Sequence, residues 1–276
     1  VRTGMVTSLS RSGTGFRVEF DAGEAMAVDS VVAATGISHF QQLPQWAASI
    51  AGDVALHTCD RITFDDLDGA RVLIVGGRQS AYEWAALAGE HGAERVDIVH
   101  RHEIPQFGRV SWKFADPYVE QTLVTPGWWR NLKASEQEAI SRQFWEAGRL
   151  TLEWWLTPRL AGDRFHRWAH NSVASVATEP SGSLSVLLAS GDRLAADRII
   201  YATGYKASLA QLPYLAGVLD EVSTADGFPV LDEGFQSSIK GLYFPGFTST
   251  RDFGPFFGFT KGCPAAATLV VDDLCR

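Results

Sequence analysis

The sequence predicts an α/β protein, and three features lead to that prediction. An apolar run, residues 71–75, precedes Gly76-Gly77 and then a segment with helical periodicity. Residues 4–36 and 171–205 share one plan, in which short alternating strands end in Ala-Thr-Gly. Residues 105–170 follow neither pattern and hold seven of the nine tryptophans. We therefore expect a nucleotide-binding type of strand–helix unit, two β-meanders and a helical, tryptophan-rich insert.

Residues 71–102 read as strand, glycine turn, helix and strand. The first strand is rich in Val and Ile, as in strands that are buried on both faces. The helix opens at Ser80, and residues 96–99 form the second strand. Free N–H groups and the helix dipole favour an anion at such a helix start, so the turn is predicted to bind phosphate. A plain connection without a ligand is the alternative. The expected apolar stripe of the helix is Ala81, Trp84, Ala85 and Ala88.

The turn departs from the usual G-x-G-x-x-G/A pattern at its third place. The first, third and sixth places hold Gly76, Arg78 and Ala81. The third glycine normally lets the backbone approach a pyrophosphate, and Arg78 could instead reach a cofactor phosphate with its side chain. The candidate cofactor-binding residues of this unit are Gly76, Gly77, Arg78, Gln79, Ser80, Ala81, His100 and Arg101.

The end of the second strand favours NADPH over NADH. An acidic residue there would bind the ribose 2′-hydroxyl of NADH, but this chain has His100-Arg101-His102 and no carboxylate until Glu103. A cation suits a 2′-phosphate. The alternative is that Arg101 is a solvated residue at the strand end.

Composition excludes several classes of function. The chain has 276 residues, 46% of them hydrophobic, and a net charge of −8, which argues against nucleic-acid binding. No apolar segment is long enough to span a bilayer, and no signal peptide opens the chain, so a cytoplasmic location without membrane association is expected. Three cysteines without a C-x-x-C argue against a disulfide scaffold or a metal site.

The two meanders are an internal duplication. Residues 31–36 and 199–204 each form an apolar strand that ends in Ala-Thr-Gly. The second copy follows the glycine turn, whereas the first has no such turn before it. Because the chain starts at Val1, directly before a strand pattern, its start is expected to be cut.

Paired Ala-Thr-Gly strands around an inserted nucleotide-binding unit resemble the flavoproteins with two dinucleotide-binding domains. These include flavin-containing monooxygenases, N-hydroxylating monooxygenases and pyridine-nucleotide oxidoreductases. The resemblance covers residues 4–104 and 171–276, and it implies a Rossmann-like NAD(P)-binding domain inserted in a partial FAD-binding domain. By that layout, on the order of 100 residues with the first FAD glycine turn would precede Val1. The chain is then either a fragment or a protein without that half.

The resemblance also implies domains and flavin contacts. Residues 1–45 would be a remnant of the FAD-binding domain, residues 46–205 the NADP-binding domain with its insert at 105–170, and residues 206–276 the return to the FAD-binding domain. A closing helix over residues 260–274 would point its N-terminus at the flavin. The implied cofactor contacts are Thr35, Gly36, Thr203, Gly204, Gly246, Thr248, Phe253, Gly254 and Pro255. A packing loop without a ligand is the alternative for the last five.

Two further segments have two interpretations each. His57-Thr58 stands where many members carry His-Ser, although a surface or capped histidine is an equal alternative. In the insert, Ser135 and Glu138 have capping-box spacing for a helix through Arg149, and residues 150–156 are expected to form a second helix that Pro158 ends. The insert either forms core or roofs a substrate pocket, in which case Asp116 and Lys113 are candidate contacts.

The resemblance implies an NADPH-dependent, FAD-containing oxidoreductase, most like a monooxygenase, that acts on a small-molecule substrate. Hydride would pass from NADPH to flavin, and the flavin would activate oxygen. No residue is predicted to be catalytic, and the chain without its flavin half would be inactive. The alternatives are a reductase for another acceptor and a non-catalytic NADP(H)-binding protein.

Overall fold

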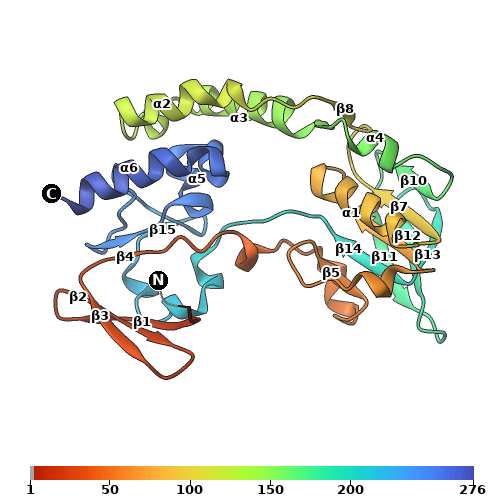
Figure 1. Cartoon of the computed structure of the whole chain (residues 1–276), viewed down its shortest axis with the longest axis horizontal. Helices are drawn as coiled ribbons and strands as arrows, with labels where there is room; N and C mark the ends of the chain where they lie inside the picture. Colours follow the sequence, from red (N-terminus) through yellow and green to blue (C-terminus); the bar gives the residue numbers. More distant parts are fainter. Residues whose placement is uncertain (1–2) are drawn as a thin grey trace. The chain divides into compact units, whose positions relative to one another are not determined.

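The computed structural model describes residues 3–276, with side chains except at positions 148 and 149, so Val1 lies outside the described residues. The chain divides into two compact units (Figure 1). Unit 1 comprises the chain up to Phe40, Trp112–Phe144 and Lys206–Arg276, and unit 2 comprises Gln41–Ser111 and Trp145–Tyr205.

A five-stranded, all-parallel sheet forms the centre of unit 2, with the strand order β10-β7-β6-β14-β5. Helix α1, Gln79–Glu90, joins β6 to β7, which confirms the predicted strand–turn–helix–strand unit. The strands are β5 (Ala55–His57), β6 (Arg71–Val75), β7 (Arg95–Val99), β10 (Phe165–Trp168) and β14 (Arg198–Tyr201).

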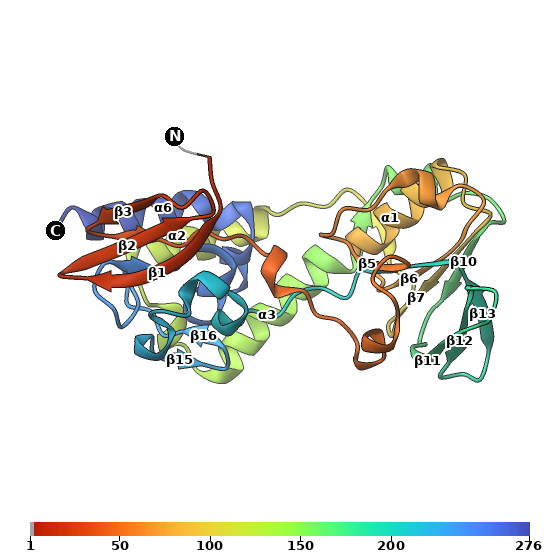
Figure 2. The ribbon, with the colours of Figure 1, turned by 90° about the horizontal axis from the view of Figure 1, so that it is seen from below.

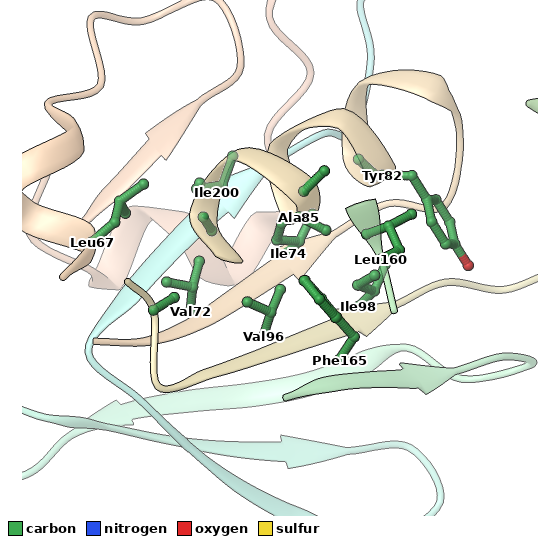
Figure 3. Packing of buried hydrophobic residues seen from close by; sticks show 14 of the residues in the cluster. Leu67, Val72, Ile74, Tyr82, Ala85, Val96, Ile98, Leu160, Phe165 and Ile200 are labelled. Carbon is green, nitrogen blue, oxygen red and sulfur yellow. The ribbon is translucent and has the colours of Figure 1, made fainter. Parts of the chain in front are cut away.

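One face of this sheet packs against α1. Ala81, Ala85 and Ala88 are buried in the contact, and Trp84 packs partly buried beside them, so the predicted apolar stripe is confirmed. Figure 3 shows Ala85 close to the side chains that β6, β7 and β14 direct toward the helix. Alanines carry little bulk, so α1 can lie close to the strands.

The opposite face of the sheet packs against an antiparallel meander (Figure 2). Its strands are β11 (Val173–Thr178), β12 (Leu184–Leu188) and β13 (Arg193–Ala196), as the repeat predicts. Leu184, Val186 and Leu188 alternate inward on β12 and meet Leu73 and Ile199 of the sheet. The parallel sheet is therefore covered on both faces, as its continuous apolar strands require.

Unit 1 contains the first meander and a two-stranded parallel sheet. The meander is β1 (Val6–Ser12), β2 (Gly15–Phe20) and β3 (Ala25–Val28). The parallel pair is β4 (Val31–Val32) with β17 (Leu242–Tyr243). The expected buried strand over residues 31–36 is wrong in length and burial, because pairing with β17 ends at Val32, which is 44% exposed.

Unit 1 also contains the helices α2 (Asp116–Val124), α5 (Thr250–Phe253) and α6 (Cys263–Leu274), and the hairpin of β15 (Thr224–Ala225) with β16 (Phe228–Pro229). The expected closing helix is confirmed, with a 3₁₀ turn at Thr260–Gly262 before it. Ala265, Ala266 and Val270 are its buried residues.

The insert belongs to both units rather than to the nucleotide-binding unit alone. Trp112 contacts Phe144 and Phe259, each at 5.4 Å between ring centroids, and residues 112–144 are part of unit 1. Helix α3, Ala134–Arg149, begins in unit 1 and ends in unit 2. The tryptophans of the insert therefore pack in two separate places.

Two local expectations in the insert are wrong. Residues 150–156 do not form a helix, because Thr151–Glu153 is a strand, β9, that pairs in parallel with β8, Gln106–Gly108, and buries Leu152. A short helix, α4 (Leu156–Arg159), follows and contains Pro158. At the start of α3, Glu136 accepts a hydrogen bond from the Lys133 N–H at 2.9 Å, whereas Glu138 pairs with Arg142.

Across residues 3–276, no helix has the length and apolarity that crossing a membrane requires.

Close packing of α1 on β10 leads to a stability prediction at Gly89. An alanine Cβ there would lie 2.4 Å from the Phe165 Cζ atom. Replacing a glycine by alanine within a helix normally raises the free energy of unfolding by up to about 1 kcal/mol. At Gly89, overpacking should outweigh that gain, and Gly89→Ala should lower the free energy of unfolding by about 1–2 kcal/mol. Denaturant unfolding measures the change. In a Phe165→Leu background, which shortens the opposing side chain, the same substitution should cost less; an equal cost in both backgrounds would contradict the packing argument.

Candidate nucleotide-binding site

The glycine turn after β6 lies where three strands end together. Gly76 has φ of +138°, and a Cβ there would lie 2.3 Å from the Ala202 carbonyl oxygen after β14. At Gly77, a Cβ would lie 2.4 Å from the His100 ring after β7. Both positions therefore require glycine, the first for its backbone conformation and both for lack of space.

A cavity of about 500 Å³ opens at this end of the sheet. It lies at the carboxyl ends of β6, β7 and β14, where the strand order reverses, which is the usual place for a ligand in a parallel sheet. The sequence-predicted residues that line it are Gly76, Gly77, Arg78, His100, Arg101, Thr203 and Gly204.

Two arginines give the lining positive charge, although the protein as a whole is acidic. Arg78, Arg101, His100 and His102 line the cavity, and none of its described lining residues is Asp or Glu. The nearest acidic neighbour of Arg101 in sequence, Glu103, lies 3.2 Å from His170. Nor does the first turn of α1 hold an acidic residue, so its N–H groups face no fixed carboxylate there.

The two arginines differ in their surroundings. Arg78 is half-buried, and its guanidinium carbon lies 4.1 Å from the ring centroid of Trp145 on α3. Arg101 is exposed at the end of β7. One cation is thus held against an aromatic ring, and the other projects from the strand end.

His100 is a neutral, structural histidine. Its Nδ1 lies 2.9 Å from the His102 carbonyl oxygen and donates to it, while its Nε2 accepts a hydrogen bond from the Tyr82 hydroxyl at 3.1 Å. Burial, with His102 nearby, lowers the pKa of His100 to about 4. Its ring therefore shapes the cavity at neutral pH without adding a charge.

The next residues of the turn stabilise the fold rather than line the cavity. Gln79 accepts a hydrogen bond from the Glu153 N–H and donates to Glu83. Ser80 is exposed, and Ala81 is buried against the sheet, as the sixth place of the pattern requires for close helix–strand packing. Ala81 can reach an anion only through its backbone N–H group.

The end of β14 is tied to the segment at Gln42. The Thr203 hydroxyl donates to the Gln42 carbonyl oxygen, and the Gln42 N–H donates to the Gly204 carbonyl oxygen at 2.9 Å. His57 is buried, and its Nε2 donates to the same Gly204 oxygen at 3.2 Å. Burial lowers the pKa of His57, which supports a neutral bracing role outside the cavity lining.

Sequence reasoning missed part of the lining. The additional residues include Gln42, Pro44, Trp46, His102, Asn171 and Ser172. Asn171 and Ser172 open the second meander, and their place at its start was the only sequence signal for them. Their position depends on how the meander packs on the sheet, which local patterns do not specify.

Several flavin-contact candidates share one edge of unit 1. Because β4 and β17 pair in parallel, Thr35-Gly36 and Gly246 follow the same ends of their strands. Gly36 and Gly246 have φ of +69° and +83°, and a Cβ at either would meet nothing within 4 Å. Thr248 is buried, and its hydroxyl donates to the Pro245 carbonyl oxygen.

The remaining candidates of unit 1 lie in its packed interior or in a separate hollow. The Phe253 ring is buried and stacks on Phe235 at 3.7 Å between centroids, so only its backbone could contact a ligand. A Cβ on Gly254 would meet the Phe256 ring. Pro255 lines an open hollow of about 420 Å³. Of the insert candidates, Asp116 forms an ion pair with Lys261, and Lys113 is exposed.

No family model matches the sequence. Among solved structures, the L-lysine 6-monooxygenase of Pseudomonas syringae has a TM-score of 0.70 and 19% identity, over 96% of this chain and 70% of that one. The ornithine N-hydroxylase of a Kutzneria species has a TM-score of 0.73 and 15% identity, over 99% and 71%. The flavin-containing monooxygenase of Stenotrophomonas maltophilia has a TM-score of 0.62 and 18% identity, over 100% and 72%.

These similarities span nearly the whole of this chain and about 70% of each relative, and at such identities they concern the fold. The expected resemblance is confirmed at that level: the chain has the α/β fold of the lysine 6-monooxygenase, the ornithine N-hydroxylase and the flavin-containing monooxygenase.

Proposed function

We propose that the cavity of unit 2 binds NADP(H), with the adenosine 2′-phosphate between Arg78 and Arg101. The observation that carries this proposal is a cavity at the strand ends whose described lining residues include two arginines and no carboxylate. NADH binding sites usually present a carboxylate to the ribose 2′-hydroxyl, and that carboxylate would repel a 2′-phosphate. The pyrophosphate would lie at the start of α1, against backbone N–H groups.

We further propose that the chain belongs to an FAD-dependent, monooxygenase-like oxidoreductase with a small-molecule substrate. The ornithine N-hydroxylase with this fold was solved with reduced FAD, NADP⁺ and L-ornithine. Gly36 and Gly246 lie at one edge of unit 1, and a Cβ at either would meet nothing within 4 Å. A flavin nucleotide could approach the backbone at these two glycines. FAD, when bound, accepts hydride and activates oxygen. The role of this chain is to bind and orient the hydride donor.

Removal of either arginine should weaken the binding of NADPH much more than the binding of NADH. Arg78→Ala or Arg101→Ala removes a charged partner of the 2′-phosphate, and such hydrogen bonds contribute about 1.5–3 kcal/mol. The affinity for NADPH should fall about 10- to 100-fold. NADH affinity should change little. Titration calorimetry of both nucleotides measures the two changes.

Arg61→Ala provides the matched control, because Arg61 is exposed in unit 2 and does not line the cavity. It should leave both affinities unchanged. Equal losses of NADPH and NADH binding in the Arg78 and Arg101 variants would refute a 2′-phosphate site.

A flavin test separates the enzyme from a non-catalytic nucleotide-binding protein. Protein expressed from the complete reading frame should carry flavin absorbance that NADPH bleaches without oxygen. Oxygen uptake that rises with a small amine or sulfide substrate would favour a monooxygenase over a reductase for another acceptor. A colourless protein that still binds NADPH would contradict the enzyme proposal and leave the nucleotide site intact.

A further inference from the structure

The cation Arg78 replaces a glycine in the turn and rests on an aromatic ring from a distant part of the chain. Its guanidinium carbon lies 4.1 Å from the Trp145 ring centroid, closer than Arg159 lies to Trp155, at 5.1 Å. Trp145 belongs to the last part of α3, within unit 2. A flexible arginine side chain gains a defined orientation from such a contact.

The Trp145 ring is itself supported by a series of ring contacts. It meets the His102 ring edge-on at 6.4 Å, and His102 stacks on His100 at 4.5 Å. His100 is in turn hydrogen-bonded to Tyr82 of α1 at 3.1 Å. Arg78 and Trp145 are therefore joined to the buried core through groups from α1, the end of β7 and α3.

The contact with Trp145 restricts the orientation of the guanidinium. When a guanidinium stacks on an aromatic ring, the face of the planar group meets the ring and its N–H donors lie in the plane, at the edge. A phosphate is bound by that edge, with two parallel hydrogen bonds. An arginine whose orientation is already restricted by a ring loses less entropy when it binds a phosphate.

We propose that Trp145 is a positioning residue that holds Arg78 for the 2′-phosphate, so that α3 completes the nucleotide subsite. This inference rests on the proposed NADP(H) site. It gives one tryptophan of the insert a role in cofactor selection, in addition to the packing role that the others have.

Two small nucleotides test the proposal without flavin or nicotinamide. 2′,5′-ADP and 5′-AMP differ by the 2′-phosphate. Calorimetry with the full chain measures the ratio of the affinity for 2′,5′-ADP to the affinity for 5′-AMP. Trp145→Leu should weaken the binding of 2′,5′-ADP about tenfold, which lies between the sizes of an exposed and a desolvated cation–aromatic contact, and change the binding of 5′-AMP less than about twofold. Trp145→Phe, which keeps a weaker aromatic ring, should give an intermediate ratio. It also provides the test if Trp145→Leu fails to fold by circular dichroism.

Trp155→Leu is the matched control, since it removes the ring that faces Arg159, outside the cavity lining. It should leave the ratio unchanged. In an Arg78→Ala background, Trp145→Leu should have no further effect on the ratio, because the arginine that Trp145 positions is absent.

The outcomes distinguish the two proposals. A ratio that falls in Arg78→Ala but not in Trp145→Leu or Trp145→Phe would overturn the positioning role and leave the NADP(H) site standing. A wild-type protein that binds both nucleotides equally would overturn the 2′-phosphate site and the positioning role together.

Discussion

The structure of unit 2 depends on the close approach of three strand ends around Gly76 and Gly77. The carbonyl of Ala202 and the ring of His100 occupy the space that two Cβ atoms would need. This crowding turns the chain sharply out of β6 and starts α1 directly above the sheet. The start of α1 and the strand ends then enclose the cavity, so a steric constraint at two residues determines the position of the proposed phosphate site.

Charge is distributed unevenly over this chain. Its net charge is −8, yet the described lining of the cavity contains arginines and histidines and no carboxylate. Other acidic groups near the sheet are engaged elsewhere. Asp97 of β7, for example, is buried between Arg95 and the indole N–H of Trp168. The charges of the residues that line the cavity, rather than the net charge of the chain, favour a phosphate there.

The tryptophan-rich insert serves both units through one helix. Residues 112–144 pack with the aromatic side chains after α5, and Trp145 at the far end of the same helix contacts Arg78. Neither of the two interpretations drawn from the sequence, core or roof, included a contact with the nucleotide turn. The insert is therefore part of the packing in unit 1 and part of the proposed cofactor site in unit 2.

The sequence by itself determined the strand–turn–helix–strand unit, both meanders and the closing helix, because hydrophobic periodicity and glycine turns are local signals. It also determined the glycine turn, Arg78 within it and Arg101 after the second strand. Only the tertiary structure decided that Thr151–Glu153 is a strand, since its pairing partner, Gln106–Gly108, lies more than forty residues earlier. The same holds for the short β4, for the burial of Phe253 and for the contact of Trp145 with Arg78. Each depends on a partner that is distant in sequence, and no local pattern of residues encodes which distant side chain will fill the space beside it.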